Sequence, residues 1–85
     1  MPEISRFLGI VIRMYYRDHA PPHFHAEYSE HEITIEIESG LVNGQFPRRA
    51  LSAVLDWYEL HQDQLLTNGI LARQELPLNR IAPLE

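Results

Sequence analysis

The sequence predicts an α+β domain, in which an N-terminal antiparallel meander of three or four strands, about residues 4–46, precedes one or two helices, about residues 48–74, packed on one face. Apolar and polar residues alternate through the first half of the chain, which is typical of strands with one buried face. Apolar residues then recur at spacings of three and four, which is typical of an amphipathic helix. Prolines interrupt residues 75–85, so this tail is expected to be extended and to dock through Leu78 and Ile81.

The first predicted strand runs from Ile4 to Arg17, and its even positions form the richer apolar face. Gly9 is expected to mark a bulge, or a bend between two shorter strands. The following segment, from Asp18 to Pro22, is expected to form a stiff loop because two adjacent prolines fix the backbone and remove two hydrogen-bond donors.

The next two strands, His23 to Tyr28 and Glu32 to Glu38, alternate cleanly and are predicted to form a hairpin. A loop of two or four residues around Ser29-Glu30 makes their apolar faces coincide. That register predicts four cross-strand pairs: Ala26 with Ile33, Phe24 with Ile35, His25 with Thr34, and His23 with Glu36.

A short strand pair or an irregular stretch is expected from Leu41 to Phe46, where Asn43-Gly44 is a type I′ turn signal. Pro47 then opens the helical region, which is predicted to bend near His61 and to be weakened at Gly69. The stripe expected to cover the sheet comprises Ala50, Leu51, Val54, Leu55, Trp57 or Tyr58, His61 and Leu65.

The composition suits one domain, spanning residues 1–85, with a modest core, since 45% of the residues are hydrophobic. The sequence has no apolar run long enough to span a membrane and no secretory signal, so a cytoplasmic protein is expected. Because it has no cysteine, disulfides and thiolate metal sites are excluded.

The charge is acidic: twelve acidic residues stand against seven basic ones, all of them arginine, for a formal net charge of −5. This balance does not favour nucleic-acid binding, although a local arginine cluster can hold a phosphate through bidentate contacts. It suits a basic protein partner. A homo-oligomer is compatible with the same composition.

The stretch from Tyr15 to Tyr28, with its Asp-His-x-Pro-Pro-His-Phe-His core, resembles the small bacterial proteins grouped as domain-of-unknown-function family 4160. The chain departs from that family at Ser29-Glu30, where glycine is usual, and at Gly69-Ile70, where an Asn-Trp pair is common. Further matching segments cover nearly the whole chain: Pro47–Leu51, Trp57, Glu59–His61, Leu65-Leu66, Pro77-Leu78 and Pro83-Leu84.

The resemblance implies no established activity. Members of this family are often encoded beside a second small protein, which implies a protein-binding module of a two-gene system, of the toxin and antitoxin type. The leading hypothesis is therefore a cytoplasmic bacterial protein whose partner is the product of a neighbouring gene. Whether the protein is an enzyme stays open.

The candidate catalytic residues are His23, His25 and His19. Two residues apart on a strand, His23 and His25 can direct both imidazoles at one ion or one substrate, and His19 can approach from the proline loop. Two imidazoles with a carboxylate are typical of zinc and other metal centres, so a metal-dependent hydrolase or nuclease is one alternative. The candidate metal ligands are His23, His25, Glu36 and Asp18.

Arginines favour a different chemistry at the same place. If Arg13, Tyr15 and Arg17 emerge on the side of His23 and His25, the two arginines would disfavour a cation and bind a phosphate or carboxylate. The histidines would then serve as general base and acid in phosphodiester cleavage. A third interpretation is that His23, His25 and Glu27 form the solvated outer face of the sheet.

Arg48-Arg49 is a separate feature, placed near the positive end of the helix dipole. That position is electrostatically unfavourable for a cation. It indicates either a solvated pair or a place where a bound anion or a partner's carboxylate compensates the two charges.

Overall fold

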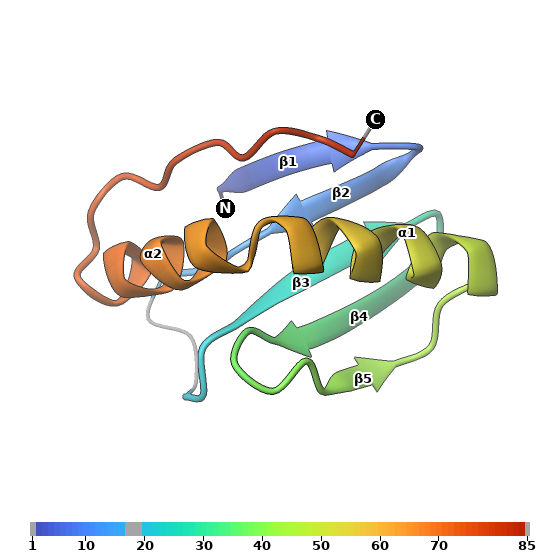
Figure 1. Ribbon diagram of the computed structural model, residues 1–85, viewed down its shortest axis with the longest axis horizontal. Helices are drawn as coiled ribbons and strands as arrows, with labels where there is room; N and C mark the ends of the chain where they lie inside the picture. The colour runs from blue at the N-terminus through green and yellow to red at the C-terminus, as the bar shows by residue number, and fades with distance from the viewer. Residues whose placement is uncertain (1, 17–19, 85) are drawn as a thin grey trace.

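The computed structural model describes residues 2–16 and 20–84 and contains a five-stranded antiparallel sheet in the order β1-β2-β3-β4-β5 (Figure 1). The strands are β1 (Glu3–Phe7), β2 (Ile10–Arg13), β3 (His23–Tyr28), β4 (His31–Glu36) and β5 (Val42–Gly44). The α+β prediction is confirmed. The sheet has one strand more than the predicted maximum of four, because β5 pairs with β4.

The first predicted strand is two strands, joined at Leu8-Gly9, where both residues have positive φ values of 53° and 79°. This is the backbone of a two-residue type I′ turn, so the predicted break at Gly9 is confirmed. The prediction that even positions form the apolar face holds at Ile4, which is buried, but it is wrong for the rest of β1. The register with β2 shifts between Glu3 and Ser5, and a bulge of this kind inverts the alternation. Phe7 is consequently buried.

The β3–β4 hairpin has the predicted register in full. Tyr28 pairs with His31, so Ser29-Glu30 forms a two-residue loop. The structure pairs Ala26 with Ile33, Phe24 with Ile35, His25 with Thr34, and His23 with Glu36. The two strands therefore place all their apolar side chains on one face.

Asn43-Gly44 is not a turn, and that prediction is wrong: both residues lie inside β5. The chain reverses instead before Gly40, whose N–H donates to the Glu36 carbonyl at 2.8 Å. Gly44 is required because β5 approaches β4 closely. A Cβ added there would lie 2.8 Å from the carbonyl oxygen of Glu32.

Helices α1 (Arg48–Leu60) and α2 (Gln62–Arg73) lie across one face of the sheet (Figure 1). The chain bends between them at His61, as predicted, with φ −124° and ψ 22°. Neither helix has the length and apolar character needed to cross a membrane. The predicted stripe forms the helical side of the core, where the buried members are Ala50, Val54, Trp57, Tyr58 and Leu65.

The tail runs back beside β1 (Figure 1). The N–H of Ile81 donates to the Ile4 carbonyl at 2.8 Å, and Trp57 Nε1 donates to the Ala82 carbonyl at 2.8 Å. The buried Asn68 amide holds the backbone of Asn79 from both sides, each at 2.9 Å. The predicted docking through Ile81 is confirmed, and the tail protects the β1 edge of the sheet.

Candidate functional site

The face of the sheet opposite the helices is polar, because the alternation that buries Phe24 and Ile35 turns their neighbours outward. We call this surface the histidine face. It consists of Arg13, Tyr15, His23, His25, Glu27, Glu32 and Glu36. Three adjacent strands and the segment after β2 supply these residues, so the sheet register fixes their relative positions.

His25 is largely enclosed, with 16% of its side chain exposed. Its Nδ1 lies 3.0 Å from Oε2 of Glu32, which sits diagonally across the β3–β4 ladder. The edge of the Tyr15 ring packs against it, with ring centroids 4.4 Å apart and planes at 89°. A carboxylate and an aromatic ring together hold this imidazole in one orientation.

His23 is oriented by the backbone. Its Nδ1 lies 3.0 Å from the carbonyl oxygen of Pro21. Because a carbonyl can only accept, this contact places the Nδ1 proton between the two atoms, and the lone pair of the neutral ring is then on Nε2. The rings of His23 and His25 are 5.2 Å apart, so the predicted convergence of the two imidazoles is present in the structure.

Arg13 lies beside His25 in the β2–β3 register, on the side that the sequence indicated. Its Nε is 3.3 Å from both carboxylate oxygens of Glu27. A phosphate at this position would compete with that carboxylate. It would also meet Glu32 and Glu36, of which Glu36 pairs with His23 in register. Three glutamates against one arginine make the histidine face more suitable for a cationic group than for an anion.

The other predicted site residues, His19, Asp18 and Arg17, lie outside the described residues. Within residues 2–16 and 20–84, no group of three or more His, Cys, Asp or Glu residues is arranged to hold a metal ion. The metal and anion assignments therefore stay predictions.

Two specific contacts of His25 were not predicted, although the alternation places both partners on its side of the sheet. Glu32 belongs to the outward-facing set of its strand, and the rule that diagonal residues interact across antiparallel strands would have paired it with His25. Tyr15 follows Arg13 by two residues and was expected on the same side, but its packing on the imidazole was not identified.

A carboxyl group with a shifted pKa, that of Glu3, lies at the edge of the sheet, at the start of β1. Glu3 accepts hydrogen bonds from Arg6 at 2.8 Å and from Arg80 at 3.2 Å. The Arg6 contact, supported by Arg80, lowers the pKa of Glu3 to about 2. These ion pairs link the tail to β1, which gives the cluster a structural role.

Residues 9–68 match the model of a protein family described as "Domain of unknown function (DUF4160)". The matched span contains strands β2 to β5, all of α1 and part of α2, and it includes the whole histidine face. Searches of curated proteins and of solved structures gave no significant match.

Proposed function

The chain belongs to the family described as domain of unknown function (DUF4160), and on that premise we propose that it is a protein-binding module whose histidine face docks a basic segment of a partner. The setting is the bacterial cytoplasm. The partner is the product of a neighbouring gene in a two-gene system, of the toxin and antitoxin type.

The observation that carries this proposal is the excess of carboxylates on a face of the sheet that the helices leave uncovered. Among the described residues, Glu27, Glu32 and Glu36 face outward there and Arg13 is the one arginine beside them, on a chain with a formal net charge of −5. Complementary charge of this kind steers association and fixes the orientation of a partner.

The arrangement also supports specific rather than diffuse binding. The imidazoles and Tyr15 pack on one another, and rigid aromatic groups are enriched at the centres of protein interfaces, with charged groups toward the rim. Glu32 remains 52% exposed while its carboxylate contacts His25, so it can accept a further hydrogen bond from an arginine or lysine of the partner.

The test is to co-express the domain with the product of the adjacent gene and to measure the complex by gel filtration and calorimetry. In the variant Glu32→Lys, Glu36→Lys, we expect the affinity to fall by at least about tenfold, which is about 1.4 kcal/mol. The control is Glu59→Lys on the exposed side of α1, which should bind as the wild type does. If no complex forms, or if both variants bind normally, the histidine face is not the docking surface.

General acid–base catalysis is a second candidate function, favoured by the orientation of two imidazoles through their Nδ1 atoms with rings 5.2 Å apart. Such a pair can take a proton from one substrate atom and give one to another. In the phosphate-directed version, Arg13 and Arg17 would bind the substrate. In the metal-dependent version, zinc would be held by His23, His25, Glu36 and Asp18.

Elemental analysis of protein without an affinity tag, together with hydrolysis of bis(4-nitrophenyl) phosphate, separates these versions. About one equivalent of zinc that is lost in the variant His23→Ala, His25→Ala would support the metal version. Metal-free hydrolysis that is lost in the same variant would support the phosphate version. If wild type and variant are alike in both measurements, catalysis by these histidines is excluded.

A further inference from the structure

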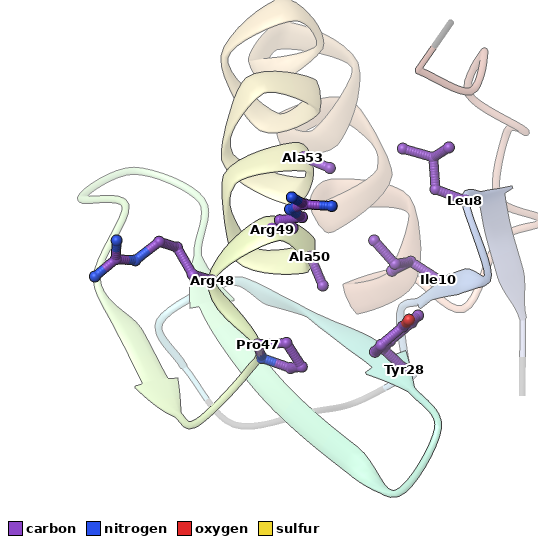
Figure 2. Close-up of a pocket in the computed structure, with 8 residues that line it drawn as sticks. All are labelled: Leu8, Ile10, Tyr28, Pro47, Arg48, Arg49, Ala50 and Ala53. Carbon is purple, nitrogen blue, oxygen red and sulfur yellow. The ribbon is translucent and has the colours of Figure 1, made fainter.

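A hollow of about 460 Å³ lies between the β1–β2 turn, the end of β3 and the start of α1 (Figure 2). Its walls are mainly apolar: Leu8 and Ile10 stand on the sheet side, while Pro47, Ala50 and Ala53 stand on the helix side. We call it the α1 groove. Because the two alanines are small, the groove keeps room for a side chain from outside.

Leu8 is an unusual residue for its position in the wall of this groove. It lies in the left-handed region, with φ 53°, which is unfavourable for an ordinary side chain. Asparagine or glycine is preferred in such turns. Leu8 is 70% exposed, so burial within the chain does little to offset that strain. A strained and exposed leucine is better explained by a contact outside the chain.

Two arginines beside the groove, Arg48 and Arg49, have no described carboxylate to compensate their positive charge. Arg6, Arg13 and Arg80 each contact a carboxylate. Arg48 and Arg49, in contrast, occupy the first turn of α1, which contains no acidic residue and no side-chain cap. Among the described residues neither of them has a carboxylate partner.

The helix dipole makes the positive charges of Arg48 and Arg49 less favourable still, because the start of a helix is its positive end. Arg73, which also lacks a described ion pair, lies in the last turn of α2, where a cation is favourable. The start of α1 is thus a basic spot on an acidic chain. Figure 2 shows the Arg49 side chain beside Ala50 and Ala53 and the Arg48 side chain directed away, toward β5.

We propose that the α1 groove binds a peptide segment of a partner protein in which an apolar side chain is flanked by carboxylates. The apolar side chain enters between Leu8 and Ala50. One flanking carboxylate pairs with Arg49 beside the groove, and another reaches Arg48 on the β5 side of α1, each through bidentate hydrogen bonds. Charge complementarity selects this occupant, because two unpaired arginines border an apolar hollow. The inference stands apart from the histidine face, which uses the opposite side of the sheet.

The test is a titration of ¹⁵N-labelled protein with a synthetic ten-residue peptide that carries two leucine pairs flanked by aspartate and glutamate. We expect the amide signals of Leu8, Tyr28 and the first turn of α1 to shift. A matched peptide with asparagine and glutamine in place of the acids should bind at least about tenfold more weakly.

Two variants sharpen the test. Leu8→Asn should weaken binding at least about tenfold, while the melting temperature stays equal or rises, since asparagine tolerates positive φ. Arg48→Gln, Arg49→Gln should weaken binding similarly, whereas the control Arg73→Gln should leave it unchanged.

Several outcomes would overturn the proposal. One is an absence of shifts at the groove, and another is equal affinity for the acidic and the neutral peptide. A third is displacement of the peptide by inorganic phosphate or by a short single-stranded oligonucleotide, which would make the groove a phosphate site. A homodimer that Leu8→Asn converts to monomer would show that a second copy of the chain is the occupant.

Discussion

The same strands build both faces of the sheet, but one face packs under the helices and the other carries outward-facing polar side chains. On the helix side, Phe24 of β3 and Ile35 of β4 are both fully buried. On the other side, one residue along each strand, His25 and Glu36 face outward. The comparison teaches that one set of side chains forms the core, and that a second, interleaved set is left outside it for the partner binding that we propose.

Side chains on the two faces should therefore contribute differently to the free energy of unfolding. Burying one large apolar side chain contributes about 1.5–3 kcal/mol. The pair of Arg13 and Glu27, with side chains 28% and 34% exposed, is partly screened by water. Pairs of that kind contribute about 0–1 kcal/mol. Substitutions on the helix side should therefore cost stability, and those on the histidine face should chiefly cost binding.

The largest expected effect is that of Phe24→Ala. The ring packs against Trp57 and Tyr58, with centroids 5.7 Å and 6.1 Å away, and its removal leaves a cavity beneath α1. We expect a loss of about 3–5 kcal/mol in the free energy of unfolding, measured by urea denaturation. A loss below about 1 kcal/mol would mean that the two faces do not differ as described.

Asn68→Ala should have the next largest effect, about 2 kcal/mol, because it leaves both backbone groups of Asn79 without their buried partner. Thr67→Ala, at an exposed neighbour, is the control and should be nearly neutral. Faster hydrogen exchange at Ile81 in the Asn68 variant would show that the tail undocks. Unchanged exchange there would contradict the role assigned to Asn68.

Tyr58→Phe should cost about 1 kcal/mol, since the hydroxyl donates to the Ile37 carbonyl at 2.6 Å. Burial raises the pKa of Tyr58 above its ordinary value of 10.0. The stability from this group is therefore fully present below pH 10 and is lost as the pH rises through the higher, folded-state pKa. Unfolding followed above pH 10 should show a shallower alkaline decline for the Phe variant, and an identical decline would contradict the assignment.

The smallest expected effect is that of Glu3→Gln, at the exposed edge of the sheet. The folded-state pKa is lowered from 4.5 to about 2 by Arg6 and Arg80. The ion pairs therefore contribute stability above pH 4.5, and this contribution is lost as the pH falls toward 2. Urea midpoints between these pH values should decline less steeply in the variant. Parallel curves would show that Glu3 is not the group responsible.

Much of this fold is predictable because the β3–β4 alternation fixes which face is buried, and the loop centred on Ser29-Glu30 then selects the register that pairs Ala26 with Ile33 and Phe24 with Ile35. Asn43-Gly44 misled the prediction because glycine was interpreted as a turn residue, whereas Gly44 is needed for the close approach of two strands. Leu8 was assigned to the apolar face because the alternation does not show that it lies in a turn, and Phe7 was assigned to the other face because a bulge leaves no mark in the alternation of a single strand.

The candidate site is predictable to a similar extent. The convergence of His23 and His25 follows from strand geometry alone. The alternation also places Glu32 and Tyr15 on this face, whereas their individual contacts with His25 depend on side-chain rotamers, which periodicity does not encode. The α1 groove joins Leu8 to Ala53, residues far apart in sequence, so only the folded chain reveals it.

The most direct test of the central claim is one experiment on the double variant His23→Ala, His25→Ala, with melting temperature and partner binding measured on the same preparation. We predict a melting temperature within a few degrees of wild type, consistent with a change of less than about 1 kcal/mol, together with loss of the complex with the neighbouring-gene product. A variant that melts as early as Phe24→Ala and still binds the partner would contradict the separation of the two faces.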